Sequence, residues 1–154
     1  MRQLLILLFL VFTSNTQAAT FKQAQDIYEQ LQVANHIQGP PLVLKQDDDV
    51  NADETEARIE VNTGFLKFAK NSSEVALTLG HELGHYVLHH HGSTIAHEYA
   101  ADQIGAIFME KAGYVKCLGA QEFKRFHSSV SCTNPGNNAT HPCDELRIKA
   151  LGCK

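Results

Sequence analysis

The sequence has 154 residues, of which 44% are hydrophobic and 19% are charged, and its formal net charge at pH 7 is −4. This acidic balance argues against nucleic acid or an anionic membrane surface as a partner. The length is that of one domain with one modest hydrophobic core.

The first 19 residues have the pattern of a signal peptide. Arg2 gives a positive start, residues 4–12 form an unbroken apolar run, and small residues at Thr16 and Ala18 mark a cleavage site after Ala18 or the next residue. The run is much shorter than the roughly 20 residues that cross a bilayer, which argues against a membrane anchor. We therefore expect a soluble periplasmic or secreted protein with a single domain over residues 20–154 and a net charge near −5.

The four cysteines, Cys117, Cys132, Cys143 and Cys153, all lie in the C-terminal quarter. In an oxidising compartment an even number predicts two disulfides, with three possible pairings. If residues 144–151 are helical, Cys143 and Cys153 are about 15 Å apart along the helix axis, beyond the reach of a disulfide. We therefore expect Cys143 to pair with Cys117 or Cys132.

The N-terminal half predicts one helix and a small sheet. Apolar residues recur at helical spacing over residues 21–37, and Gly39-Pro40-Pro41 ends that helix. Residues 42–44 and 58–61 are candidate strands, and the acidic segment 47–56 between them is expected to be a solvated loop. These segments predict a small antiparallel sheet ahead of the next helix.

Helices dominate the rest of the chain. Asn71-Ser72-Ser73-Glu74 has the form of a capping box and predicts a helix to about His91, before Gly92. Within it, Gly80 and Gly84 mark a face that another backbone could approach closely. Further helices are expected over residues 95–112, 120–130 and 144–151, with a loop over residues 131–142.

The central helix contains an HExxH motif, His81-Glu82-Leu83-Gly84-His85. Residues four apart lie on one helix face, so the two histidines can bind one zinc ion. Glu82 lies one step round the helix, where it can act as general base for water at the open coordination position. The motif also occurs in inert helices, so the third ligand has to be found elsewhere.

Glu98 is the candidate for that third ligand. It follows His85 by thirteen residues, on a helix that can fold back antiparallel to the first. Asp102, four residues further on, would face the same site and could accept the second N–H of a ligating histidine. Without the HExxH motif, both carboxylates could equally be exposed helix residues.

The motifs occur in four separate blocks. Besides His81–His85, they are Glu98–Gly105 with Met109 and Ala112-Gly113-Tyr114, the upstream segments Val50-Asn51-Ala52 and Val61–Leu66, and downstream Thr140-His141-Pro142 with Arg147-Ile148. In this order they strongly resemble the zinc peptidases typified by the heat-shock protease HtpX and the CAAX prenyl proteases, over roughly residues 42–151.

The resemblance implies an α+β fold, a helical zincin-like metallopeptidase core with a small antiparallel β-sheet or hairpin. It implies a gluzincin, with Zn²⁺ on His81, His85 and Glu98 and with Glu82 as the general base. The segment from Ile59 to Asn62 would be the edge strand along which an extended substrate lies. His141 and Arg147 match family positions, and one or both are expected to approach the active site, where a histidine could stabilise an oxyanion.

The expected function is that of an exported zinc endopeptidase that cleaves unfolded or extended polypeptides, perhaps in envelope protein quality control. Two alternatives stay open: a catalytically silent zinc-binding or inhibitory module, and an immunity-repressor type of protease, which also contains His-Glu-Leu-Gly-His but acts in the cytoplasm.

His81, His85 and His89 cannot form one triad, because the outer two would be about 12 Å apart along the helix. The run His89–His91 is expected to be a polar helix end.

Overall fold

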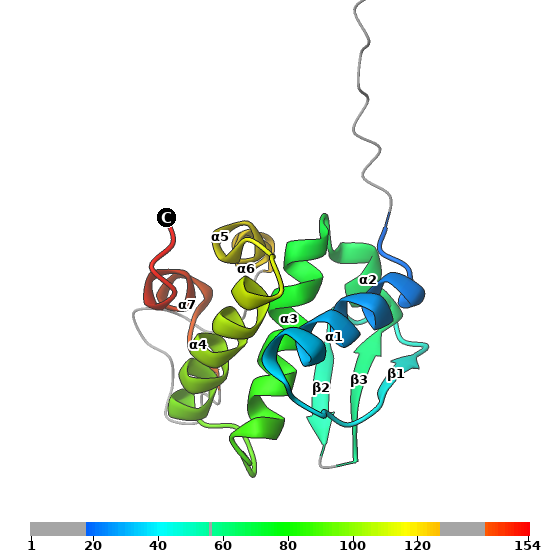
Figure 1. The fold of residues 1–154 in the computed structure, drawn as a ribbon. Helices are drawn as coiled ribbons and strands as arrows, with labels where there is room; N and C mark the ends of the chain where they lie inside the picture. The colour runs from blue at the N-terminus through cyan, green and yellow to red at the C-terminus, as the bar shows by residue number, and fades with distance from the viewer. Residues whose placement is uncertain (1–17, 56, 127–140) are drawn as a thin grey trace, which may run out of the picture.

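The computed structural model describes residues 18–55, 57–126 and 141–154. In these residues helices precede and follow a small sheet, which lies to one side of the molecule (Figure 1). The elements in chain order are α1 (Phe21–Asn35), β1 (Leu42–Lys45), β2 (Ala52–Thr55), β3 (Arg58–Asn62), α2 (Thr63–Phe68), α3 (Ser72–Val87), α4 (Ile95–Lys111), α5 (Lys116–Gly119), α6 (Gln121–Arg125) and α7 (Asp144–Ala150). The fold is therefore α+β with a helical core, as expected.

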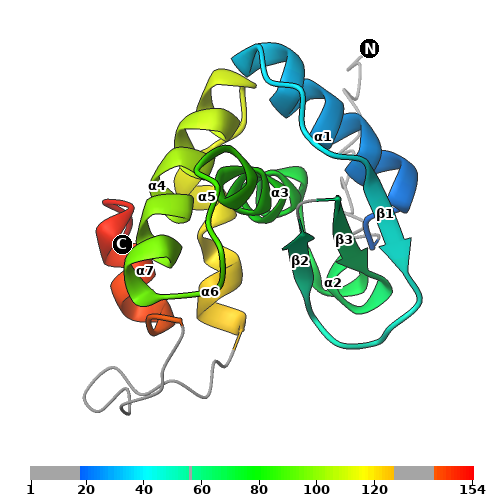
Figure 2. The same cartoon turned by 90° about the horizontal axis from the view of Figure 1, so that it is seen from below.

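Helix α3 lies at the centre of the molecule. Figure 2 shows it end-on, with α4 on one side and the sheet on the other. Its side chains are buried over most of its length because both neighbours cover it. The N-terminus is capped by Asn71, whose side chain accepts hydrogen bonds from the N–H groups of Ser73 and Glu74. Glu74 in turn accepts a hydrogen bond from the backbone N–H of Lys70.

Glycines allow α3 and α4 to approach backbone to backbone. A Cβ on Gly105 would lie 2.6 Å from both the carbonyl carbon of Gly80 and the N of His81. A Cβ on Gly84 would lie 3.0 Å from the carbonyl oxygen of Ala101. The expected close approach at Gly80 and Gly84 is confirmed, and it sets the separation of the two helices next to the HExxH motif.

The sheet differs from the expected one in topology. The hairpin of β2 and β3 is antiparallel, but β1 pairs with β3 in parallel, so the sheet is mixed. The acidic segment expected to be all loop contains β2, because alternate residues of Ala52–Thr55 are partly covered while Asp53 and Thr55 are exposed. Such a polar edge strand has no hydrophobic run to reveal it.

The strand order β1-β3-β2 corrects a second expectation. The segment Ile59–Asn62 belongs to β3, which is the central strand and has a neighbour on each side. The edge strand on the side of α3 is β2. The error follows from overlooking β2, since without it β3 would be an edge.

Two helices end earlier than expected. Helix α3 ends at Val87, because His89 adopts a left-handed conformation (φ 51°) and turns the chain back. The helix expected over residues 120–130 corresponds to α6, which ends at Arg125, and the short helix α5 that precedes it was not expected. Residues 127–130 and the expected loop up to residue 140 lie outside the described part of the chain.

A disulfide joins Cys117 in α5 to Cys153, which follows α7. Cys143 therefore does not pair with Cys153, as expected, nor with Cys117. Its other expected partner, Cys132, lies outside the described residues, within which no cysteine is free. Most of the expected signal peptide, residues 1–17, also lies outside them. None of the described helices has the length and hydropathy of a membrane span.

Candidate active site

The two histidines of the HExxH motif face each other across one turn of α3. Their Nε2 atoms lie 3.0 Å apart, and His81 is almost fully buried. The Nδ1 of His81 lies 2.9 Å from Oδ1 of Asp102. Because a carboxylate only accepts, Nδ1 of His81 carries the proton of this hydrogen bond. In the neutral ring, Nε2 then has its lone pair free for a metal.

The helix α4 brings Glu98 to these nitrogens. Thr94 caps the helix by accepting a hydrogen bond from the N–H of His97, which places Glu98 in the first turn, facing α3. Its Oε2 is 3.4 Å from Nε2 of His81 and its Oε1 is 3.5 Å from Nε2 of His85. The side chain is 2% exposed, and Oε2 makes no hydrogen bond of good geometry with the described residues.

These three residues fit a zinc ion. One ligand atom from each of His81, His85 and Glu98 lies within 4.8 Å of the others. Two imidazole nitrogens and one carboxylate oxygen form the donor set of a catalytic zinc site, which keeps a fourth position open. A buried carboxylate oxygen that lacks a well-aligned donor, beside two converging nitrogens, is accounted for by a cation bound between them. In the described part of the chain this is the only such group of metal-binding side chains.

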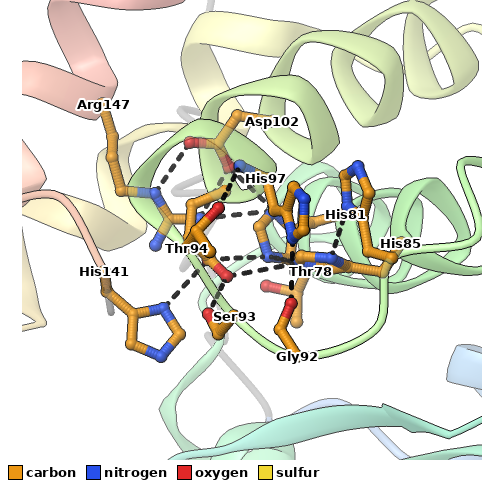
Figure 3. Close-up of polar contacts among 12 residues, drawn as sticks. Thr78, His81, His85, Gly92, Ser93, Thr94, His97, Asp102, His141 and Arg147 are labelled. Carbon is orange, nitrogen blue, oxygen red and sulfur yellow. Dashed lines mark hydrogen bonds and ion pairs between the residues drawn. The ribbon is translucent and has the colours of Figure 1, made fainter. Parts of the chain in front are cut away.

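Arg147 binds Asp102 next to His81, and the two side chains share Oδ1 of this carboxylate (Figure 3). The guanidinium Nε donates to Oδ2 of Asp102 at 2.8 Å, and Nη2 donates to Oδ1 at 2.6 Å. Burial raises the pKa of Asp102, but the hydrogen bonds from Arg147 and His81 outweigh it and lower the pKa to about 2. Asp102 is therefore ionised at neutral pH and fixed in orientation, as a partner of a metal-binding histidine needs to be.

His141 approaches the same site from the segment before α7. Its Nδ1 lies 2.9 Å from Oε2 of Glu98, and the ring is about half exposed. Figure 3 shows it on the same side of the site as Arg147. Ser93 donates a short hydrogen bond to Oε1 of Glu98. Burial raises the pKa of Glu98, but the close nitrogens of His141 and His81 and the hydrogen bond from Ser93 hold it far below its usual value.

Glu82 lies beside the three side chains that could hold the metal, without being one of them. It is buried and borders the same cavity as His81 and Glu98. Burial, and to a smaller extent the charges of Asp53 and Glu98, raise the pKa of its carboxyl to about 7 in spite of the opposing charge of His81. A carboxyl that titrates near neutral pH is suited to accept and return a proton.

The same motif lies in the part of the chain that matches a known protein family. The family model for peptidase family M48 matches residues 18–97, more than half of the sequence, and includes His81, Glu82 and His85. The chain belongs to peptidase family M48. The comparison with curated proteins found no match. Membership of this family supports a metallopeptidase. It does not distinguish an HtpX-like from a CAAX-prenyl-protease-like member, so that resemblance stays a prediction.

In this M48 chain the structure brings together every residue expected at the site. His81, Glu82 and His85 come from α3, Glu98 and Asp102 from α4, and His141 and Arg147 from the C-terminal segment. Both residues of that last pair reach the site: His141 contacts Glu98, and Arg147 contacts Asp102.

Sequence reasoning missed three residues of the site. His90, expected in a polar helix end, lies with Nδ1 2.9 Å from Nδ1 of His85, and its ring stacks on that of His97 at 4.1 Å. Ser93 contacts Glu98, and Glu122 borders the cavity. The turn after α3 brings His90 back to His85, and no periodicity within the helix could show it. No motif marks Ser93 or Glu122.

Proposed function

We propose that this chain is an exported zinc-dependent endopeptidase that hydrolyses peptide bonds in unfolded or extended polypeptides. The observation that carries the proposal is the position of Glu82, a buried carboxyl of raised pKa beside the three side chains that can bind the metal. Ligation alone does not require a carboxyl at that position. Membership of family M48 supports the same chemistry.

In the proposed mechanism His81, His85 and Glu98 hold the ion. Zinc, when bound, polarises the scissile carbonyl and lowers the pKa of water. Glu82 accepts the proton of the attacking water and returns it to the leaving amine. His141, half exposed beside Glu98, is placed to donate a hydrogen bond to the oxygen that becomes negative in the transition state. Asp102 and Arg147 keep the ring of His81 in orientation.

The edge strand β2 supports an extended substrate. It pairs only with β3 among the described strands, so its other edge can form backbone hydrogen bonds with a peptide. The cavity that contains Glu82 begins at the start of this strand, at Val50, Asn51 and Ala52. Backbone pairing gives affinity with little dependence on sequence, which suits unfolded chains.

The exported location is part of the proposal and rests on the signal-peptide pattern of residues 1–19. The disulfide between Cys117 and Cys153 supports it, because such bonds persist in oxidising compartments. Among the relatives that the sequence resembles, this location favours a role like that of HtpX in the quality control of envelope proteins over CAAX processing. The proposed partner is therefore a polypeptide substrate, with neither nucleic acid nor a membrane.

The alternative is a silent zinc-binding or inhibitory module. The test compares the purified mature protein with its Glu82→Gln variant, each loaded with one equivalent of zinc and incubated with an unfolded protein. Cleavage by the first alone is expected, with equal zinc content in both. Tight zinc binding by both proteins without cleavage by either would favour the silent module. Equal cleavage by both would remove Glu82 from the mechanism.

A further inference from the structure

A cavity of about 440 Å³ opens next to the proposed metal site and continues away from it. His81, Glu82 and Glu98 border one part of it. Much of the remaining wall is apolar and includes Phe65, Phe68, Leu77, Phe123 and Phe126. Its position beside the site where the peptide bond would be cleaved makes it a pocket for a substrate side chain near that bond.

One carboxyl in this wall has no cationic partner among the described residues. Glu122 of α6 is 5% exposed, and its Oε1 accepts a hydrogen bond from Oγ1 of Thr78 at 2.8 Å. Its Oε2 is closed to solvent and makes no hydrogen bond with any described residue. The carboxyl turns about one soft terminal torsion, so the oxygen that Thr78 does not hold can be presented to the cavity.

The cations nearby are committed to other carboxylates. Arg147 donates two hydrogen bonds to Asp102, and Arg125 donates two to Glu74. Neither forms an ion pair with Glu122. Burial is the largest effect on the Glu122 carboxyl, and together with the charge of Glu74 it raises the pKa to about 8 against the hydrogen bond from Thr78 and the charge of Arg147. The free protein therefore keeps a proton on Glu122 at neutral pH.

A buried acid without a counter-ion destabilises the fold, and glutamine would keep the hydrogen bond with Thr78 without that cost. A glutamate at this costly position is accounted for by a ligand that brings the missing cation.

We propose that this cavity binds the side chain of a substrate lysine next to the scissile bond, and that Glu122 is the residue that selects it. The apolar wall fits the four-carbon stem, and the carboxylate meets the ammonium at its end. Lysine fits better than arginine, because Thr78 occupies one oxygen of Glu122. A guanidinium would need both oxygens for its bidentate pairing, whereas an ammonium is a compact point charge.

The edge strand supplies a second, independent argument. The exposed side chain of Asp53 projects from β2 next to Ala52, which borders the same cavity as Glu82, so Asp53 lies near the proposed site of cleavage. A peptide paired with β2 would therefore run beside an acidic side chain before it reaches the cavity. Basic segments of an unfolded chain are attracted to such a groove, and acidic ones are repelled.

This inference rests on the proposed function, since it names the substrate of the same site. A digest of an unfolded protein by the zinc-loaded enzyme, read by mass spectrometry, identifies the bonds cleaved. One such peptide is then made again with lysine, norleucine or arginine at each position within two residues of the bond. Norleucine has the lysine stem without its charge. At one position we expect lysine to be cleaved with a kcat/KM about 10- to 100-fold above norleucine, and arginine to fall between them.

The Glu122→Gln variant tests whether Glu122 causes the preference for lysine over norleucine. Its ratio of lysine to norleucine should fall to near one, whereas the ratio for Glu145→Gln, the same change at an exposed position of α7, should stay that of the wild type. Circular dichroism shows whether each variant is folded. A wild-type ratio near one at every position, or an unchanged ratio in Glu122→Gln, would overturn the inference while leaving the proposed peptidase intact.

A binding measurement separates the two proposals. Peptide hydroxamates that differ only in lysine or norleucine are titrated into the zinc-loaded protein by calorimetry, which requires no turnover. Tighter binding of the lysine compound, lost in Glu122→Gln, supports the subsite even if no peptide is cleaved, in which case the proposed function fails alone. Equal binding of the two compounds contradicts the subsite.

Discussion

Asp102 and Arg147 act on the proposed metal site without contributing a ligand. Arg147 occupies both oxygens of Asp102, and Oδ1 is shared with Nδ1 of His81. Arg147 Nη2 also lies 3.4 Å from this nitrogen, but two donors cannot bond each other, so its effect passes through Asp102. The guanidinium lies over the ring of Phe123 at 4.1 Å, which fixes its plane. The orientation of one imidazole therefore depends on a side chain near the end of the chain.

Replacing Asp102 with asparagine should weaken zinc binding by about 10- to 100-fold. An amide keeps one acceptor and adds a donor, so it cannot satisfy His81 and both N–H groups of Arg147 together. Competition against a chelator of known affinity measures the effect. Asp48→Asn is the control, because its side chain is 88% exposed. Unchanged affinity in Asp102→Asn would show that the orientation of His81 does not depend on this carboxylate.

Glu122 should give the stability a pH dependence that its glutamine variant lacks. Its pKa is about 8 in the folded protein against an ordinary value of 4.5, so the folded state keeps a proton that the unfolded state loses. The stability is therefore fully present below about pH 4.5 and falls as the pH rises through about 8, by an amount on the order of 5 kcal/mol.

Urea unfolding of wild type and Glu122→Gln at a series of pH values checks this prediction. Other titrating groups are the same in both proteins, so they cancel in the difference. Between pH 5 and 8 the free energy of unfolding of the variant should rise relative to that of the wild type. A difference that does not change with pH would mean that Glu122 is already ionised in the folded protein.

At the scale of elements, the distance between α3 and α4 is set by backbone rather than by side chains. Glu98 and Asp102 both belong to α4, and their partners His81 and His85 belong to α3. The contact of Gly80 with Gly105 lies directly beside His81. Any side chain inserted there has to push the two halves of the metal site apart.

Replacing Gly105 with alanine should therefore destabilise the protein and weaken zinc binding together. The added Cβ would meet backbone atoms of Gly80 and His81 at 2.6 Å, which costs about 1–3 kcal/mol of overpacking. This exceeds the gain of about 1 kcal/mol in helix propensity. Thermal unfolding and chelator competition measure the two effects. Ile107→Ala, on the exposed side of α4, should leave zinc affinity unchanged, and a Gly105→Ala protein with normal affinity would refute the argument.

Elements with a strong local pattern could be predicted from the sequence, and those that depend on distant contacts could not. The periodic helices α1, α3 and α4 and the spacing of His81, His85 and Glu98 predicted the helical core and the grouping of those three side chains. The strand β2 was not predicted because Asp53 and Glu54 make its sequence resemble a loop. The parallel pairing of β1 was missed for the same reason. Glu122 comes to the cavity only through the packing of α6, which no local pattern encodes.

At the scale of the whole molecule, α7 is held in place by the disulfide of Cys117 with Cys153, a loop of 36 residues. The double variant Cys117→Ser/Cys153→Ser should be less stable by about 2–4 kcal/mol, because its unfolded state is less constrained. The double change avoids leaving a single thiol that could react elsewhere. Denaturant unfolding under non-reducing conditions measures the loss, and equal stability of the two proteins would show that packing alone holds α7.

The disulfide and the position of Arg147 in the chain together impose an order of events on the protein. A growing chain has all three metal-binding residues long before α7 has been made, yet Asp102 then lacks its cation and α7 lacks its covalent tie. A chain that is reduced or incomplete should therefore have an imperfect metal site. For the proposed peptidase, full proteolytic competence would thus arise only after α7 has been made and has brought Arg147 to Asp102, which would limit cleavage by an incomplete chain.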